Sequence, residues 1–141
     1  MRSILCAIMA LALGIAAAIP IASHAADNLP YLYDQLKKPA YRGALEAALR
    51  TGKNLPRWIG VFMKTYNGVA TPGTTVVVEG ETLELYGVCE PHNCGGNFLY
   101  ALFEQGGGRA WALVTKDGKV FTVLGSPSPA QKQALMDATK T

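Results

Sequence analysis

The chain has few cysteines, few histidines and little charge, and these shortages exclude several kinds of site. Cys89 and Cys94 have no second cysteine or histidine pair to complete a structural zinc site. The run Gly106-Gly107-Gly108 lacks the Gly-Lys-Ser/Thr ending of a phosphate loop and is predicted to be a hairpin turn. The sequence therefore indicates no metal and no other cofactor.

The first 25 residues have the pattern of a secretory signal peptide. Arg2 gives the positive start, residues 4–21 are apolar and uncharged, and Ser23-His24-Ala25 places small residues before a cleavage site. An uncleaved membrane anchor is the alternative, since the apolar stretch is 18 residues long. Cleavage is favoured because Pro20 and small residues end the stretch and no basic cluster follows. The predicted product, residues 26–141, is an exported domain that is not in the membrane.

Cleavage changes the chemistry of the remaining 116 residues (141 minus 25). Loss of Arg2 lowers the net charge from +3 to +2, which is too small and too evenly spread to indicate a nucleic-acid partner. Loss of Cys6 leaves Cys89 and Cys94 as a single pair in an oxidising compartment, where a disulfide persists. His92 becomes the one histidine. A chain of this length forms one compact domain.

The mature chain is predicted to begin with three helices. Asn28 is expected to cap the first, which Pro39 ends. Apolar residues then recur at three- and four-residue spacing from Ala40 to Arg50, and Gly52 follows that helix. A third helix is expected from Asn54 to about Tyr66, with its aromatic side chains packed inward as core.

Five strands and a final helix follow. The strands are predicted at 75–79, 82–88, 98–103, 109–115 and 119–124 from their β-branched residues and alternating polarity. Short turns such as Asp117-Gly118 join them. Ser128, Pro129 and Gln131 have the pattern of a capping box that starts the last helix. The predicted fold class is α/β in the α+β sense: a single-domain three-layer sandwich in which helices flank a five-stranded antiparallel meander sheet.

The stretch Cys89-Glu90-Pro91-His92-Asn93-Cys94 is the most informative part of the sequence. Two cysteines five positions apart can be bridged only if the residues between them form a tight turn. Pro91 suits the second position of a type I or II turn, which places His92 at the third position, on the tip. A disulfide there fixes the loop before a partner arrives and lowers the ordering cost of binding. We therefore expect a rigid protrusion whose imidazole fills a concave, carboxylate-lined cleft.

Other interpretations of the same residues fit less well. Cys89, His92 and Cys94 offer three metal ligands, but a structural site wants four. A thiol oxidoreductase needs Cys-x-x-Cys at a helix start, and a cysteine nucleophile needs a free thiol. His92 has the competing interpretation of an exposed turn residue without a partner. The carboxylates are predicted to be solvated surface groups, so no catalytic residue and no enzyme are expected; they include Asp34, Glu46, Glu79, Glu81, Glu84, Glu90, Glu104, Asp117 and Asp137.

The chain resembles the Ivy family, periplasmic inhibitors of vertebrate lysozyme. The resemblance rests on the exported start, the size, the order of helices and strands, and the stretch from Gly87 to Tyr100 with its Cys-x-Pro-His-x-Cys core. It implies that the loop enters the active-site cleft of C-type lysozyme. There Cys89 and Cys94 would hold the loop, Pro91 would shape it and His92 would contact the catalytic carboxylates. The resemblance also implies dimers and a second partner, the cell's own lytic transglycosylases.

The loop departs from the commoner family form Cys-Lys-Pro-His-Asp-Cys at two positions. Glu90 replaces the lysine and Asn93 replaces the aspartate, which changes the formal charge of the loop from zero to −1. A carboxylate is repelled by the two catalytic carboxylates, although a basic lysozyme attracts a negative loop from a distance. The hypothesis is that inhibition of C-type lysozyme is weak or absent. The alternative function is binding of endogenous lytic transglycosylases or of peptidoglycan.

Overall fold

One antiparallel sheet forms the middle layer of the structure. The computed structural model describes residues 28–141, and the predicted signal peptide, residues 1–25, lies outside the described residues. The elements in chain order are α1 (Leu32–Gln35), α2 (Pro39–Leu49), α3 (Arg57–Thr65), β1 (Val69–Ala70), β2 (Thr74–Val78), β3 (Glu81–Cys89), β4 (Phe98–Glu104), β5 (Ala110–Lys116), β6 (Lys119–Leu124) and α4 (Pro129–Ala138).

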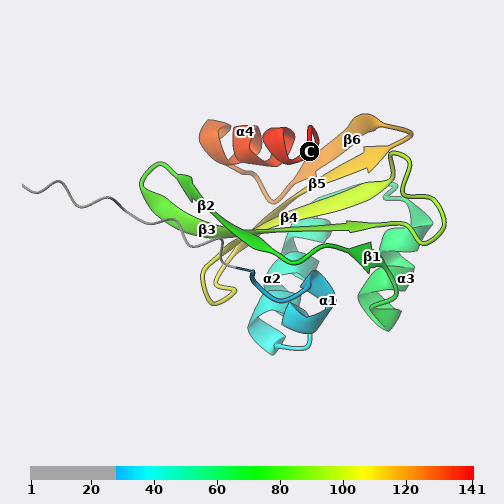
Figure 1. Cartoon of the computed structure of the whole chain (residues 1–141), viewed down its shortest axis with the longest axis horizontal. Coiled ribbons are helices and arrows are strands. Elements are labelled where there is room, and N and C mark those ends of the chain that lie inside the picture. Colours follow the sequence, from blue (N-terminus) through cyan, green and yellow to red (C-terminus); the bar gives the residue numbers. More distant parts are fainter. Residues whose placement is uncertain (1–27) are drawn as a thin grey trace, which may run out of the picture.

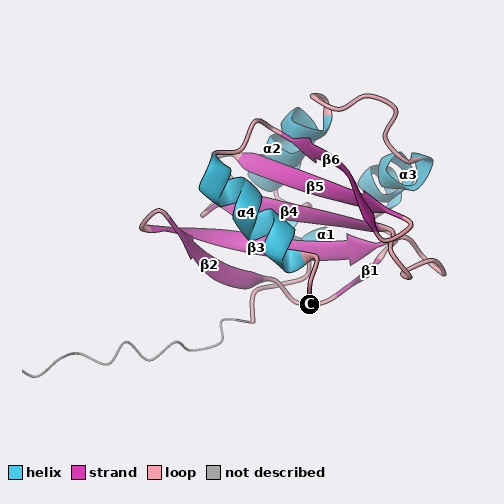
Figure 2. Ribbon diagram, turned by 90° about the horizontal axis from the view of Figure 1, so that it is seen from above, coloured by secondary structure: helices cyan, strands magenta, loops and turns pink. Residues whose placement is uncertain are grey.

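Helices cover both faces of the sheet, as predicted. Helices α1, α2 and α3 lie on one face and α4 lies on the other (Figures 1 and 2). Strands β2 to β6 are each antiparallel to the next, so the predicted meander is confirmed. The sheet is open, with β4 in the middle of the strand order β1-β3-β4-β5-β6.

The count of five strands was wrong by one short strand. Val69 of β1 pairs with Cys89, and Ala70 pairs with Val88, so β1 lies beside the end of β3. Strand β2 pairs with the other half of β3 on the same edge. A two-residue strand is too short to produce an alternation of polar and apolar residues that sequence analysis can detect.

The predicted ends of the first helices also need correction. Pro39 begins α2 instead of ending the helix before it, because its fixed φ and missing N–H suit the first helical position. Asn28 caps no helix: the adjacent Leu29 bridges to Gly73 as extended chain, and α1 has only four residues. Asn54 has a φ of 55°, and the residue that precedes α3 is Pro56. The capping box of α4 is confirmed, with Ser128 and Gln131 each accepting a backbone N–H of the other.

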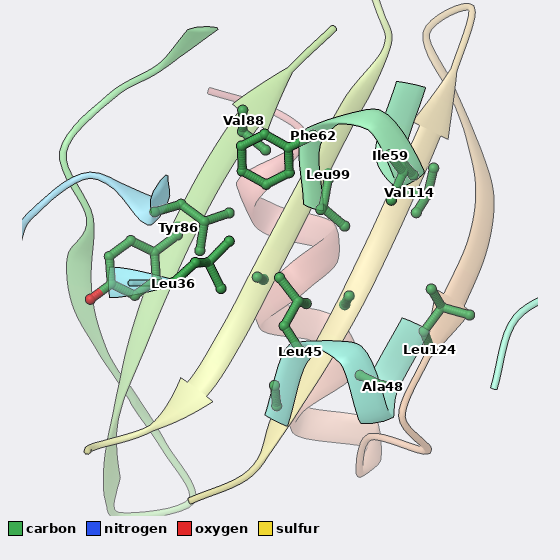
Figure 3. Close-up of a cluster of buried hydrophobic side chains, with 14 of the residues drawn as sticks. Leu36, Leu45, Ala48, Ile59, Phe62, Tyr86, Val88, Leu99, Val114 and Leu124 are labelled. Carbon is green, nitrogen blue, oxygen red and sulfur yellow. The ribbon is translucent and has the colours of Figure 1, made fainter. Parts of the chain in front are cut away.

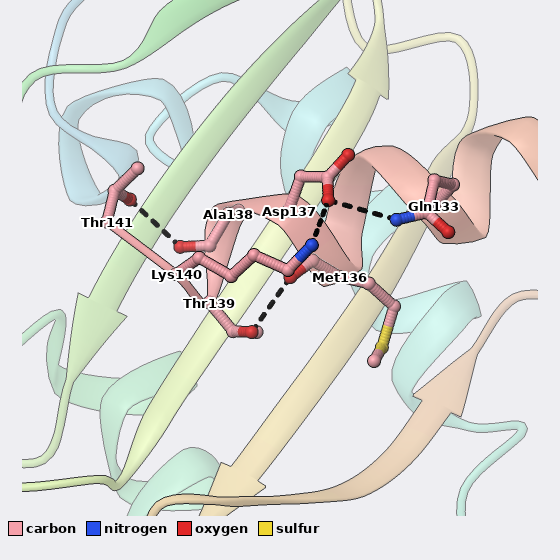
Figure 4. A network of polar contacts seen from close by, with 7 residues as sticks. All are labelled: Gln133, Met136, Asp137, Ala138, Thr139, Lys140 and Thr141. Atoms are coloured by element: carbon pink, nitrogen blue, oxygen red, sulfur yellow. Dashed lines mark hydrogen bonds and ion pairs between the residues drawn. The ribbon is translucent and has the colours of Figure 1, made fainter.

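Two apolar cores lie on the two faces of the sheet. The larger one packs α1, α2 and α3 against the sheet through buried residues such as Leu45, Phe62 and Leu99 (Figure 3). The smaller one packs Leu135 of α4 against Leu102, Trp111 and other residues of the opposite face. At the end of α4, Asp137 accepts hydrogen bonds from Gln133 and Lys140, each across one helical turn (Figure 4).

Glu84 was predicted to be solvated and is buried instead, with 7% of its surface exposed. Its carboxylate accepts hydrogen bonds from the Tyr41 hydroxyl at 3.1 Å and the Tyr86 hydroxyl at 2.9 Å. Gln35 donates to the Tyr86 hydroxyl at 2.8 Å. This network joins α1, α2 and β3. It explains how a carboxylate is tolerated in the core, since buried polar groups need hydrogen-bond partners.

Candidate functional site

The loop between β3 and β4 is closed by a disulfide. Cys89 is the last residue of β3 and is bonded to Cys94, with 5.1 Å between their Cα atoms. The Asn93 amide N–H donates to the Glu90 carbonyl at 3.0 Å, which closes a β-turn with Pro91 and His92 at its centre. The predicted position of His92 on the turn is therefore the one that the structure has, and its side chain is exposed.

His92 has a left-handed backbone conformation. Its φ of 63° identifies the turn as type II, in which the third residue has a positive φ. Glycine and asparagine are the usual residues there, although histidine tolerates this region better than most side chains do. The sequence left type I and type II open. The type II turn presents the imidazole at the tip of the loop, and the neighbouring Pro91 is half-buried.

The two residues that depart from the commoner loop sequence contact each other. The Asn93 side-chain amide donates to the Glu90 carboxylate at 2.8 Å. Glu90 is half-buried, and one of its carboxylate oxygens is occupied across the turn. The direction of this side chain was open in the sequence, and the structure directs it toward Asn93.

A buried asparagine connects the loop to the neighbouring hairpin. Asn97 is 5% exposed; its side chain donates to the Asn93 carbonyl and accepts the Asp117 N–H, both at 3.3 Å. Its own carbonyl accepts the Glu90 N–H at 3.0 Å. Thr115 adds to this support, because its hydroxyl donates to the Gly96 carbonyl at 2.8 Å and accepts the Phe98 N–H at 2.9 Å.

Gly96 lets the loop touch the turn between β5 and β6. Its φ is 126°, and a Cβ at this position would collide with the backbone nitrogen of Gly118. The Gly118 N–H donates to the Gly96 carbonyl at 3.1 Å. Asp117 and Gly118 both have positive φ, as a type I′ hairpin turn requires. Sequence analysis assigned no role to Asn97 or Thr115, and the glycine pair directly after Cys94 was the signal for this close approach.

The disulfide excludes the functions that need a free thiol. Both cysteines are in the disulfide, so neither can act as a thiolate ligand or nucleophile. Within residues 28–141, no group of three or more histidine, cysteine, aspartate or glutamate side chains is arranged to hold a metal ion. No helix in that part of the chain is long and apolar enough to cross a membrane.

The fold and the loop define a small α+β domain that presents a braced, disulfide-closed turn at one end of an open sheet. The family model described as "Inhibitor of vertebrate lysozyme (Ivy)" matches residues 41–141, which is most of the chain. The chain therefore belongs to the Ivy family, and the predicted resemblance to that family is confirmed. This is a family of inhibitors, so the prediction that the protein is not an enzyme is confirmed too.

Two relatives extend the comparison. The chain is 29% identical over 113 residues to a protein of Pseudomonas aeruginosa named "Inhibitor of vertebrate lysozyme", with 79% of this chain and 71% of the relative covered. It is 24% identical over 115 residues to an uncharacterised protein of Yersinia pestis, with 82% of this chain and 69% of that protein covered.

Proposed function

We propose that the protein acts in the periplasm and inhibits C-type lysozyme by inserting the Cys89–Cys94 loop into the active-site cleft. The observation that carries the proposal is the exposed His92 side chain at the tip of a turn that a disulfide, Asn97 and the β5–β6 hairpin hold in place. Membership of the Ivy family and the name of the Pseudomonas relative support it.

In this mechanism His92 lies where the scissile glycosidic bond of the substrate would lie, and its imidazole hydrogen-bonds the catalytic carboxylates. An imidazole can donate from one ring nitrogen in its neutral form and from both when protonated, so it suits a pair of acidic groups. The braced turn contributes affinity because little chain entropy is lost when the loop binds. Cys89, Cys94 and Pro91 shape the loop, and Glu90 and Asn93 flank the imidazole.

Glu90 sets the expected strength of inhibition. Its carboxylate brings negative charge near two catalytic carboxylates, and like charges in a desolvated interface oppose binding. The hydrogen bond from Asn93 neutralises no charge but keeps the Glu90 side chain against the turn. We therefore expect weak inhibition, with His92 still as the contact residue.

The test is hydrolysis of bacterial cell walls by a C-type lysozyme as the purified mature protein is added. His92→Ala should remove the inhibition, and Val77→Ala, a change at an exposed site at the other end of the sheet, should preserve it. Equal inhibition by wild type and His92→Ala would contradict the proposed contact. Circular dichroism and a count of free thiols should show that each variant is folded and oxidised.

A second candidate target follows from the negative charge of the loop. If the folded, oxidised protein leaves lysozyme fully active, an endogenous lytic transglycosylase or peptidoglycan is the next partner to examine. Recovery of a transglycosylase from envelope extract on immobilised wild-type protein, but not on His92→Ala, would support that function. Sedimentation of the mature protein tests the predicted homodimer separately.

A further inference from the structure

Exposed large apolar side chains gather beside the loop. Val61 on α3 is 46% exposed, and Val69, which pairs with Cys89, is 55% exposed. Val120 and Phe121, both 42% exposed, lie at the start of β6, directly after the hairpin turn that touches Gly96. We call Val61, Val69, Val120 and Phe121 the collar, because one pair lies on each side of the loop.

The side of the loop that faces α3 is hollow. A depression of 290 Å³ is lined by Arg57, Trp58, Val61, Asn67, Glu90 and Pro91. Because Glu90 and Pro91 belong to the loop, the depression is continuous with the surface that the proposed function places in the cleft. On the side of α3, the apolar residues that line the depression include Val61, a member of the collar.

The loop alone is too small to form a whole protein–protein interface, even that of a weak inhibitor. Interfaces of standard size bury about 800 Å² on each partner and involve roughly 20–30 residues on each side. The disulfide-closed loop has six residues, and Cys89 is buried in the free protein. A loop that enters a cleft also brings the two lips of the cleft against the surfaces on either side of it. In this fold those surfaces carry the collar.

We infer that the collar is the remainder of the lysozyme-binding surface, an inference that rests on the proposed function. One lip of the cleft lies in the depression against Val61, with Val69 beside the loop, and the other lies on Val120 and Phe121. Large exposed apolar side chains on both sides of a binding loop favour a protein interface there, because burial of their apolar area supplies affinity. The loop then sets the orientation.

The experiment compares three matched substitutions by surface plasmon resonance on an immobilised C-type lysozyme. Val61→Asn and Phe121→Asn remove apolar contact from the two sides of the collar without adding charge. Val77→Asn makes the same change at the far end of the sheet, where Val77 is 67% exposed. Each collar variant should raise Kd roughly tenfold, mostly through faster dissociation, and Val77→Asn should leave Kd within about twofold. Thermal unfolding of each variant verifies that it is folded.

The outcomes separate the collar from the loop when His92→Ala is measured in parallel. Unchanged Kd for both collar variants, with binding lost in His92→Ala, overturns the collar and leaves the proposed function intact. Weaker binding by the collar variants with no effect of His92→Ala supports the collar and overturns the loop as the plug. An equal loss in Val77→Asn overturns the collar, and no binding by the wild-type protein overturns both ideas.

Discussion

The side-chain amide of Asn93 donates to the Glu90 carboxylate at 2.8 Å across the tip turn of the loop. These are the two positions at which the loop departs from the commoner family sequence Cys-Lys-Pro-His-Asp-Cys, which has Lys and Asp there. In that form the same positions hold opposite charges that would pair across the turn. Here a hydrogen bond joins the two positions, and the loop carries a net negative charge beside His92.

Restoring both charges should strengthen inhibition. The double variant Glu90→Lys with Asn93→Asp removes the net negative charge and supplies an ion pair in place of the hydrogen bond. We expect the inhibition constant for a C-type lysozyme to fall roughly tenfold, because the net negative charge of the loop beside the catalytic carboxylates is cancelled. The measurement is an inhibition titration at low and high salt.

Glu81→Gln is the control for this change. It raises the net charge by one, as the double variant does, at an exposed position at the opposite end of β3. Because C-type lysozymes are basic, loss of a negative charge far from the contact should weaken inhibition slightly or leave it unchanged. Equal strengthening by Glu81→Gln would show that the effect of the double variant is not local to the loop.

The contact between the loop and the β5–β6 turn can be tested with two adjacent glycines. Gly96→Ala should lower the free energy of unfolding by about 1–3 kcal/mol, because it combines a positive φ with a collision against Gly118. Gly95→Ala is the matched control, since a Cβ there meets open space. Urea unfolding measures both. Similar stability of the two variants would contradict the close packing described for Gly96.

The buried network around Glu84 should make a measurable contribution to stability. Tyr86→Phe removes the hydroxyl that donates to Glu84 and accepts from Gln35, leaving buried polar atoms without that partner. The expected loss is about 1–3 kcal/mol in the free energy of unfolding. Tyr31→Phe, at a tyrosine that is 37% exposed, should cost little. Urea unfolding at neutral pH checks both, and an equal effect of the two substitutions would contradict a special role for the network.

Sequence analysis found the elements whose signals are local. The Asp117-Gly118 turn, the Ser128 capping box and the disulfide-closed loop each depend on residues close together in the chain, and each was predicted. Glu84 shows why other features were missed. Alternation along its strand indicated an exposed position, but α1 and α2 bring Gln35 and Tyr41 over that face, and the strand pattern contains no information about those partners.

The candidate site divides in the same way. The positions of the turn proline and the tip histidine could be predicted from the spacing of Cys89 and Cys94. The support from Asn97 and Thr115 could not, because their hydrogen bonds join the loop to the β5–β6 hairpin, which lies far along the chain. The depression beside the loop depends on α3, which lies more than twenty residues earlier in sequence. A local motif can therefore identify the loop, but the surfaces around it come only from the tertiary packing.

Alkaline pH should destabilise the fold through its buried and half-buried tyrosines. Burial is the main cause that raises the pKa of Tyr86, Tyr41 and Tyr100 above the ordinary value, and hydrogen bonds to Glu84 raise the first two further. A tyrosine whose pKa is raised in the folded state contributes stability that is complete below the unfolded pKa of about 10 and is lost as pH rises toward the folded pKa. The free energy of unfolding in urea should therefore be constant from pH 8 to about 9.5 and fall above pH 10.

The variant Tyr86→Phe tests this coupling. Although less stable at neutral pH, it should show a shallower fall, since it lacks the tyrosine whose pKa is raised most. An identical slope in wild type and Tyr86→Phe would show that ionisation of Tyr86 is not coupled to unfolding.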